Sequence, residues 1–373
     1  MDSSLHEVWQ AAAGSPFLPT IGKNTQFLVA FILLLIGISL TGVFALTETQ
    51  SIFKAVATST RPLYQLLKCI NFTPRVHVQI TQQGIRFAAD HARVMQGVSF
   101  LDSALFQTYS VNLPVSDDGE ANEPVNFQIP LASLLEVLQI FGAVDVAARA
   151  QKADADPYRS NLRNYRPDAF SNQTLGLAGT CTLLYAEEGD SFKVTIEESG
   201  VKTTAALTTY VPEIPEEIPF DRNDMAFKII MPSRSLLDSF AEISPTAPTK
   251  LVITTSKSAP FLTLAGLGDL GSSAVDFARG REIMETFSIQ ERWSQSFKFD
   301  FIKNSTEAMR IASKVSLRGD RQGVLNLQLM VVTEGDKQCF LDFRFVPFVQ
   351  YEDDEEGDGA GGQGEGGDLE MSD

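Results

Sequence analysis

The sequence is poor in the residues that build metal centres and disulfide frameworks. Its 373 residues include only three cysteines and three histidines, and Cys69, Cys181 and Cys339 lie far apart with no CxxC pair. This spacing excludes a zinc-finger arrangement and disfavours a disulfide framework. We therefore expect a reducing environment inside the cell.

Motifs of common catalytic sites are also lacking. The sequence contains no P-loop, no HExxH motif and no nucleophile elbow. A metal-dependent nuclease needs carboxylates that converge from rigid elements. The Asp-x-Glu spacings at Asp118 to Glu120 and at Asp368 to Glu370 fall in a polar loop and in a glycine-rich tail. We therefore expect no catalytic residue, metal or cofactor, and keep a 3′–5′ exodeoxyribonuclease in DNA repair as an alternative.

Positive charge is scarce overall, but the deficit is concentrated at one end. The formal charge is −17, and residues 351–373 contain ten Asp or Glu with no Lys or Arg, so the preceding residues carry only −7. Local basic surfaces thus remain compatible with the composition. We expect residues 351–373 to be an acidic disordered tail, either a solubilising terminus or a regulatory segment that includes Ser372.

One long apolar run is present near the start of the chain. Residues 27–46 carry no charge, and fourteen of them are Leu, Ile, Phe or Val. About 20 apolar residues are enough to cross the hydrocarbon core of a bilayer as a helix. Taken alone, this segment predicts a membrane anchor.

From residue 50 onward the pattern is one of short strands and short helices, and it occurs twice. At an offset of 174, the segment that begins IFKAVATSTRPLYQLL aligns with AFKIIMPSRSLLDSFA, which pairs Phe53 with Phe227 and Leu63 with Leu237. The same order of strand, helix and several strands follows each segment. Such a duplication indicates two similar domains side by side.

The domain boundaries follow from breaks in this pattern. We expect an N-terminal extension at 1–49, a first domain at 50–209 with a polar loop at 149–174, and a second domain at 225–350. Residues 210–224 contain three prolines and several acids, so they predict a connector without regular structure. Each domain is expected to contain two helices, the last of which spans residues 301–315.

The first-half stretches FKAVATSTRPLYQLLKCINF and GIRFAADHARVMQGVSFLDSALFQTY resemble the Rad-one family of DNA-damage checkpoint clamp subunits. FKIIMPSRSLLDSF and the ending FRFVPF are similar to the wider sliding-clamp family of replication processivity factors. The resemblance covers roughly residues 50–350. It implies an α+β sliding-clamp fold with two similar domains, each with two helices on antiparallel sheets.

The resemblance also implies a function. Family members join two other clamp-like subunits in a heterotrimeric ring, which an ATP-dependent clamp loader opens and closes around double-stranded DNA without sequence specificity. The ring marks damage sites in the nucleus as a non-catalytic platform for checkpoint and repair proteins. In such rings the helices line the hole and the sheets form the outer wall and the subunit joints.

Two of the expected helices carry cations that suit a DNA-lined hole. Arg61 and Lys68 share one face of the first helix, and Lys303, Arg310 and Lys314 recur along the last. The alternative is that these are the solvated faces of amphipathic helices. The other two helices carry Glu136, or Arg234 beside acids, so a ring of identical chains would have a poorly electropositive hole.

The connector has a second possible use. In clamps it crosses the outer face of the sheets beside a groove that binds partner peptides, and Val211, Ile214 and Ile218 are candidates for such a surface. A plain tether between domains is the alternative.

The apolar run at 27–46 lies outside the family pattern. A nuclear ring subunit has no need of a spanning helix before its first strand. Three explanations stay open: a membrane anchor, a buried or chaperoned helix, or translated sequence from a misassigned start or intron.

Overall fold

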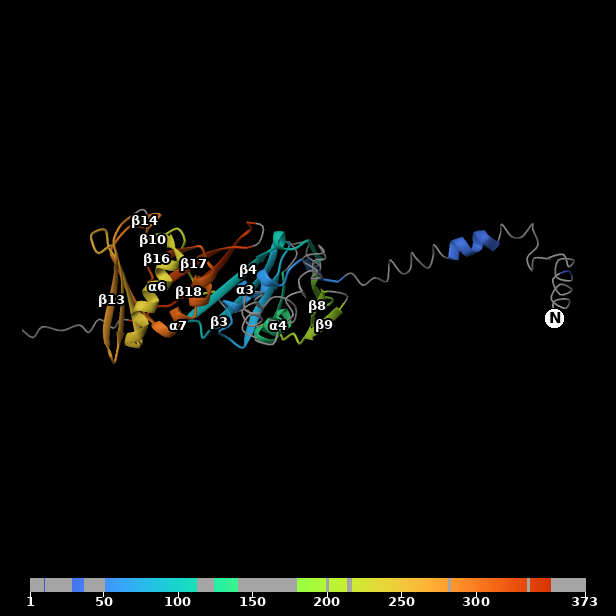
Figure 1. Cartoon of the computed structure of the whole chain (residues 1–373), viewed down its shortest axis with the longest axis horizontal. Coiled ribbons are helices and arrows are strands. Elements are labelled where there is room, and N and C mark those ends of the chain that lie inside the picture. Colours follow the sequence, from blue (N-terminus) through green and yellow to red (C-terminus); the bar gives the residue numbers. More distant parts are fainter. Residues whose placement is uncertain are drawn as a thin grey trace, which may run out of the picture.

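Antiparallel strands dominate the chain, and short helices lie along them (Figure 1). The computed structural model describes residues 10, 29–36, 51–112, 124–139, 180–198, 201–212, 217–280, 283–333 and 336–349. Among these residues every named strand pairing is antiparallel. The α+β class expected from the sequence agrees with this architecture of antiparallel sheets and few helices.

The elements of the first half begin at Phe53 and end at Leu207. In chain order they are β1 (Phe53–Ala57), α3 (Arg61–Lys68), β2 (Arg75–Ile80), β3 (Gly84–His91), β4 (Met95–Asp102), η1 (Ser103–Leu105), β5 (Thr108–Val111), β6 (Val125–Pro130), α4 (Leu131–Leu138), β7 (Thr180–Tyr185), β8 (Phe192–Glu198) and β9 (Val201–Leu207).

The second half repeats this order of strands, except that two short helices take the place of α4 and the 3-10 helix follows the first helix instead of the fourth strand. Its elements are β10 (Met225–Pro232), α6 (Ser233–Ile243), η4 (Ser244–Thr246), β11 (Lys250–Thr255), β12 (Leu262–Gly268), β13 (Gly271–Phe277), β14 (Thr286–Ile289), β15 (Trp293–Lys298), α7 (Phe299–Lys303), α8 (Thr306–Ile311), β16 (Lys314–Asp320), β17 (Leu325–Val332) and β18 (Gln338–Phe345).

Strand pairing follows the same order in both halves. The five-stranded sheet β5-β1-β7-β8-β9 has its counterpart in β14-β10-β16-β17-β18, and β4-β3-β2-β6 has its counterpart in β13-β12-β11-β15. The registers agree as well, because Phe53 pairs with Val111 as Phe227 pairs with Ile289. The strands β4 and β18 pair with each other and merge two of these sheets into one sheet of nine strands.

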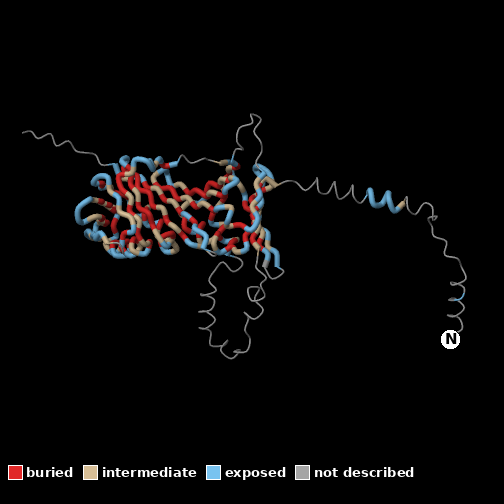
Figure 2. Tube along the Cα trace, turned by 90° about the horizontal axis from the view of Figure 1, so that it is seen from above, coloured by how far each residue is buried: buried red, intermediate tan, exposed pale blue. Residues whose placement is uncertain are grey.

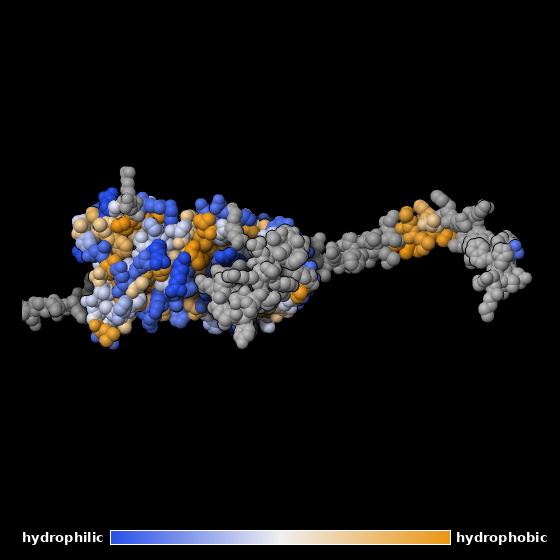
Figure 3. Space-filling view, viewed as in Figure 1, coloured by the Kyte–Doolittle hydropathy of each residue, from blue (hydrophilic) through white to orange (hydrophobic). Residues whose placement is uncertain are grey.

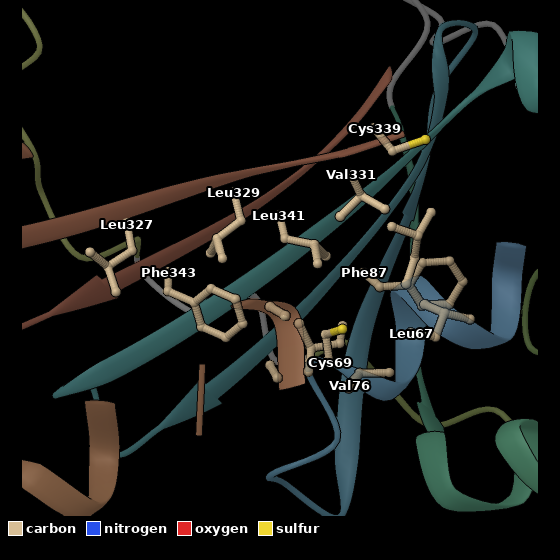
Figure 4. Close-up of a cluster of buried hydrophobic side chains, with 14 of the residues drawn as sticks. Leu67, Cys69, Val76, Phe87, Leu327, Leu329, Val331, Cys339, Leu341 and Phe343 are labelled. Carbon is tan, nitrogen blue, oxygen red and sulfur yellow. The ribbon is translucent and has the colours of Figure 1, made fainter. Parts of the chain in front are cut away.

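The core runs through the joint between the two halves. Figure 2 shows the buried residues as a band along the middle of the body, and they form a single cluster. In the close-up of Figure 4, Leu341 and Phe343 of β18 lie on the same side of the sheet as side chains from the first half, among them Phe87. The halves therefore share one hydrophobic core, which fixes their relative position.

Helix α3 forms where the sequence predicts it. Pro62 stands in its first turn, where a missing N–H leaves no hydrogen bond unmade, and Leu63, Leu66 and Leu67 are buried at helical spacing. The amide of Arg61 donates to the hydroxyl oxygen of Ser59 at 3.3 Å, which satisfies one donor at the helix start.

The single helix predicted at residues 301–315 is wrong. Two helices, α7 and α8, occupy this stretch and are separated at Asn304 and Ser305. The buried Ser305 hydroxyl donates to the carbonyl of Ile302 at 2.6 Å, and the Thr306 hydroxyl donates to that of Lys303 at 2.7 Å. Such side-chain bonds to the backbone compete with a continuous helix. At Ala312 the backbone turns extended, and β16 begins two residues later.

Candidate nucleic-acid interface

The helices lie next to one another in a row that crosses the joint between the two halves. Helix α6 packs against α8, α8 contacts α3, and α3 packs against α4. Figure 1 shows α6, α7, α3 and α4 spread along the long axis of the molecule. We call these elements, together with α8, the helical row. Residues far apart in the sequence are thereby placed on neighbouring surfaces.

Four of the predicted cations, two from each half, belong to this row. Arg61 and Lys68 are exposed on α3, opposite the buried leucines of the same helix. Lys303 is exposed at the end of α7, and Arg310 is exposed near the end of α8. The structure therefore brings four of the five predicted DNA-facing cations onto helices of one row.

A carboxylate that sequence reasoning missed lies among these cations. Glu307 of α8 accepts a hydrogen bond from Arg310 one turn later, and its Oε2 lies 3.5 Å from the Nζ of Lys68 on α3. The three side chains are 40%, 61% and 51% exposed, for Glu307, Arg310 and Lys68 respectively. Glu307 thus offsets part of the charge of two predicted DNA contacts and links the helices of the two halves.

The placement of Lys314 differs from the prediction. It is the first residue of β16, where its Nζ donates to the Oε2 of Glu285 at 2.8 Å. Because the helix ends at Ile311, Lys314 does not continue the face of Lys303 and Arg310. The assignment of Lys314 to the last helix is therefore wrong, and its contact with DNA stays a prediction.

The formal charge of the helical row is zero. Its helices carry five cations, namely Arg61, Lys68, Arg234, Lys303 and Arg310, and five carboxylates, namely Glu136, Asp238, Glu242, Asp300 and Glu307. On α6, Arg234 pairs with Asp238 at 2.9 Å. Figure 3, which shows the molecule from the same side as Figure 1, has hydrophilic residues gathered over the middle of the body. This surface can hold phosphate groups only loosely, because half of its charges repel them.

The second part of the connector, from Glu217 onward, is attached to the outer face of the nine-stranded sheet. Glu217 forms ion pairs with Arg86 of β3 and with Arg344 of β18, the latter at 3.2 Å. The amide of Ile218 donates to the Oε1 of Gln96 at 3.3 Å, and Arg344 donates to the carbonyl of Ile218 at 2.6 Å. The connector is therefore anchored across the joint between β4 and β18.

The three connector residues proposed as a partner surface have different positions. Val211 is 85% exposed, whereas Ile218 is only 3% exposed and packs into the protein as an anchor. Ile214 lies outside the described residues. Of these two described residues, only Val211 has a side chain that is accessible from solvent. Tyr210, next to it, forms a β-bridge with Gln128 and stacks under Arg75, whose guanidinium carbon is 3.8 Å from the ring centre.

The three cysteines are buried. Burial raises the pKa of the Cys69 thiol to about 12, with a further rise from Glu307 and an opposing effect of Lys68. Burial also raises the pKa of Cys181 to about 12 and raises that of Cys339. Since the thiolate is the reactive form, none of the three is an activated nucleophile.

Within the described ranges, no group of three or more His, Cys, Asp or Glu side chains is placed to hold a metal ion. The carboxylates considered for a nuclease, at Asp118, Glu120, Asp368 and Glu370, all lie outside those ranges.

The apolar run is described only in part. Residues 29–36 form a helix with exposed apolar side chains, visible as the hydrophobic segment of Figure 3, and the rest of 27–46 lies outside the described residues. Among the residues described, no helix is both long enough and apolar enough to span a bilayer.

Comparison with known proteins agrees with the resemblance seen in the sequence. Residues 52–331 match the family described as repair protein Rad1/Rec1/Rad17. The chain is 28% identical over 305 residues to the DNA damage checkpoint control protein rad1 of Schizosaccharomyces pombe, covering 82% of this chain and 89% of the relative.

Two further relatives carry different names. Over 289 residues the chain is 28% identical to the cell cycle checkpoint protein RAD1 of Homo sapiens, covering 78% of this chain and 89% of the relative. The DNA repair exonuclease REC1 of Mycosarcoma maydis is 21% identical over 179 residues, which cover 40% of this chain and 39% of that protein.

Proposed function

The chain belongs to the Rad1 repair-protein family, and on this premise we propose that it is a non-catalytic subunit of a nuclear checkpoint clamp that encircles DNA at damage sites. In this proposal residues 50–209 and 225–350 are the two clamp domains, and residues 210–224 connect them. Two other clamp-like subunits complete the ring, and an ATP-dependent loader places it on double-stranded DNA.

The proposal rests on two edge strands, β9 and β13, each of which has a pairing partner on one side only among the described strands. In the repeated order of strands, β13 is the counterpart of β4, and β9 is the counterpart of β18. The strands β4 and β18 pair with each other, whereas β9 and β13 end their sheets without a second neighbour among the described strands. Each open edge thus corresponds to a strand that forms a joint elsewhere in the same chain.

An open strand edge is a template for another strand. If each edge pairs with a neighbouring subunit as β4 pairs with β18, the sheets continue from subunit to subunit. Repetition of one such joint around an axis closes a ring when the rotation allows it. The helical row then lies on one surface of that ring.

The zero net charge of the helical row suits a ring that encloses DNA without binding it tightly. A closed ring is retained by topology, so its inner surface needs few phosphate contacts, and loose contacts permit sliding along the duplex. Since the row of this chain carries no net charge, the other two subunits are expected to supply most of the cations around the hole.

Checkpoint and repair proteins would bind on the outside of the ring. Glu217 anchors the connector across the joint, and Val211 is exposed next to Tyr210, which forms a bridge with Gln128 of β6. An exposed apolar residue beside an anchored segment suits the docking of a short partner peptide.

Topological retention tests this function directly. The chain is assembled with two clamp-like subunits of its own organism and loaded with ATP and the loader onto nicked circular DNA. The ring is expected to resist high salt on the circle and to leave when a restriction enzyme linearises the DNA. Retention that is the same on circular and linear DNA, or failure of the three subunits to assemble, contradicts the proposal.

A 3′–5′ exonuclease is the rival function, and the name of the Mycosarcoma maydis relative is what favours it. Mg²⁺-dependent digestion of a 3′-labelled duplex distinguishes the two. Under our proposal the purified chain and its Asp118→Asn/Glu120→Gln variant release label equally slowly. Rapid release by the unmodified chain alone supports the exonuclease.

A further inference from the structure

The joint between β18 and β4 sets large side chains against small ones. On its core-facing side β18 carries Leu341 and Phe343, both fully buried, and these stand opposite Ser99 and Gly97 of β4. A Cβ added at Gly97 would lie 2.9 Å from a ring carbon of Phe72 and 3.1 Å from one of Phe343. The missing side chain of Gly97 therefore provides the space that aromatic rings occupy.

Strand β9 is the counterpart of β18 but carries smaller side chains at two positions of the joint. The pair Val194–Ala205 in the β8–β9 ladder corresponds to Leu327–Phe343 in the β17–β18 ladder. By the same register, Thr203 stands where β18 carries Leu341. Leu207 stands where β18 carries Phe345, so the open edge β9 is depleted of volume at the positions of Leu341 and Phe343.

Strand β13 keeps the small residue of its counterpart β4 at one position, Gly97, whereas Val275 stands where β4 carries Ser99. The pair Gly266–Ser273 in the β12–β13 ladder corresponds to Ala89–Gly97 in the β3–β4 ladder. Both Ala205 and Ser273 are partly buried, whereas the next residues on each strand, such as Ala206 and Ala274, are exposed. Ala205 and Ser273 therefore lie on the sides of their strands that face the interior.

Pairing of β9 with β13 from a second copy would set Ala205 against Ser273. In the internal joint the same place holds Phe343 against Gly97, so a joint between identical chains would lack one aromatic ring at its centre. Poorly filled apolar interfaces lose both burial and dispersion contacts. The two open edges of this chain would therefore leave the centre of such a joint underfilled.

We propose that each open edge selects its partner by side-chain volume. The strand that pairs with β9 carries a large apolar residue opposite Ala205, and the strand that pairs with β13 carries one opposite Ser273. Both partners are antiparallel strands of other clamp-like subunits, so this selection excludes a second copy of this chain. The inference rests on the proposed ring and specifies the chemistry of its joints.

Enlarging β9 tests the inference with the chain alone. The variant Ala205→Phe gives β9 the aromatic ring that β18 carries in the internal joint, so it is expected to self-associate at least about tenfold more tightly than the unmodified chain. Sedimentation velocity of both proteins over the same concentration range measures this. The matched control, Ala206→Phe, adds the same group on the exposed side of β9 and is expected to behave as the unmodified chain.

Three results overturn the inference: self-association of the unmodified chain as tight as that of the variant, no gain in the variant, or an equal gain in the control. Circular dichroism reports whether each variant is folded. If Ala205→Phe is unfolded, Ala205→Leu adds less volume to the same side of the strand and is judged by the same criteria.

Assembly with the two other subunits provides the reciprocal test. Here Ala205→Phe is expected to reduce heterotrimer yield at least about tenfold, because the partner's large side chain already fills the space, while Ala206→Phe leaves the yield unchanged. Equal yields with Ala205→Phe and Ala206→Phe overturn the inference and leave the ring intact. If the unmodified chain forms no heterotrimer, it is the proposed function that fails.

Discussion

Lys68 and Glu307 join the two halves of the molecule across the helical row, with 3.5 Å between Nζ and Oε2. Glu307 also pairs with Arg310 on its own helix, so one carboxylate contacts two of the cations that we propose to face DNA. Pairs this exposed contribute little to stability, of the order of 0–1 kcal/mol each. Under the proposed function, the more important effect expected of Glu307 is therefore on the affinity of the row for DNA.

The change Glu307→Gln is expected to strengthen retention of the assembled ring on DNA at low salt. It removes one negative charge and releases Lys68 and Arg310 to contact phosphates. The slope of log affinity against log salt should steepen by up to about 1.8, at about 0.9 for each additional phosphate neutralised. Fluorescence anisotropy with a labelled duplex over a range of salt concentrations measures the slope.

Glu285→Gln is the control for this change. Glu285 also pairs with a lysine, Lys314, at 2.8 Å, but that lysine belongs to β16 and not to the helical row. The control should leave the salt slope unchanged. Equal slopes for Glu307→Gln and the unmodified ring would mean that the row does not contact phosphate.

Charge reversal tests the four cations that the structure places on the helical row. Changing Arg61, Lys68, Lys303 and Arg310 together to Glu is expected to weaken loading or retention on nicked circular DNA, because each reversal replaces attraction to phosphate with repulsion. Retention is measured by gel filtration of the loaded circle at increasing salt. Lys314→Glu is the comparison, and it should retain the ring as the unmodified protein does.

The order of the elements could be predicted from the sequence because apolar periodicity is a local signal. The strands around Phe53 and Phe227 and the helix at Arg61–Lys68 follow directly from it. The break between α7 and α8 could not be predicted from periodicity, since it depends on a buried Ser305 hydroxyl that bonds to the backbone. The position of Lys314 depends on a second break, the end of α8 at Ile311.

The contacts of the candidate site are mostly long-range and were harder to anticipate. Glu307 meets Lys68 only because α8 and α3 lie side by side across the joint, which the sequence of either helix does not indicate. The sequence interpretation did not include the anchoring of the connector by Glu217, because it considered only the apolar residues of that segment as a docking surface. The acidic character of the segment was the available signal, since Arg86 and Arg344 carry the complementary charge.

Removal of the Glu217 side-chain charge should loosen the connector. Glu217→Gln leaves Arg86 and the largely buried Arg344 without a carboxylate partner on the connector, although Asp342 remains 3.6 Å from Arg344. We expect about 1 kcal/mol of destabilisation and faster hydrogen exchange at the amide of Ile218. Exchange measured by mass spectrometry tests this, with Glu187→Gln in an exposed turn as the control.

The joint between β4 and β18 should be sensitive to changes of volume in both directions. Phe343→Ala empties a fully buried site and is expected to cost about 3–5 kcal/mol of unfolding free energy. Gly97→Ala adds a methyl group where ring carbons of Phe72 and Phe343 already lie within 3.1 Å, so it should cost about 1–3 kcal/mol. Urea unfolding followed by circular dichroism measures both.

Combining Phe343→Ala with Gly97→Ala tests whether the two residues contact each other in the joint or destabilise the protein independently. If Phe343 occupies the space beside Gly97, the methyl group added by Gly97→Ala should be tolerated better once the ring is gone. The double variant should then lose less than the sum of the single losses, because residues in contact are not additive. The control is the double variant of Phe343→Ala and Val98→Ala, because Val98 lies on the opposite side of β4. Its loss of unfolding free energy should equal the sum of the two single losses. Additivity in both pairs would mean that Gly97 does not make room for Phe343.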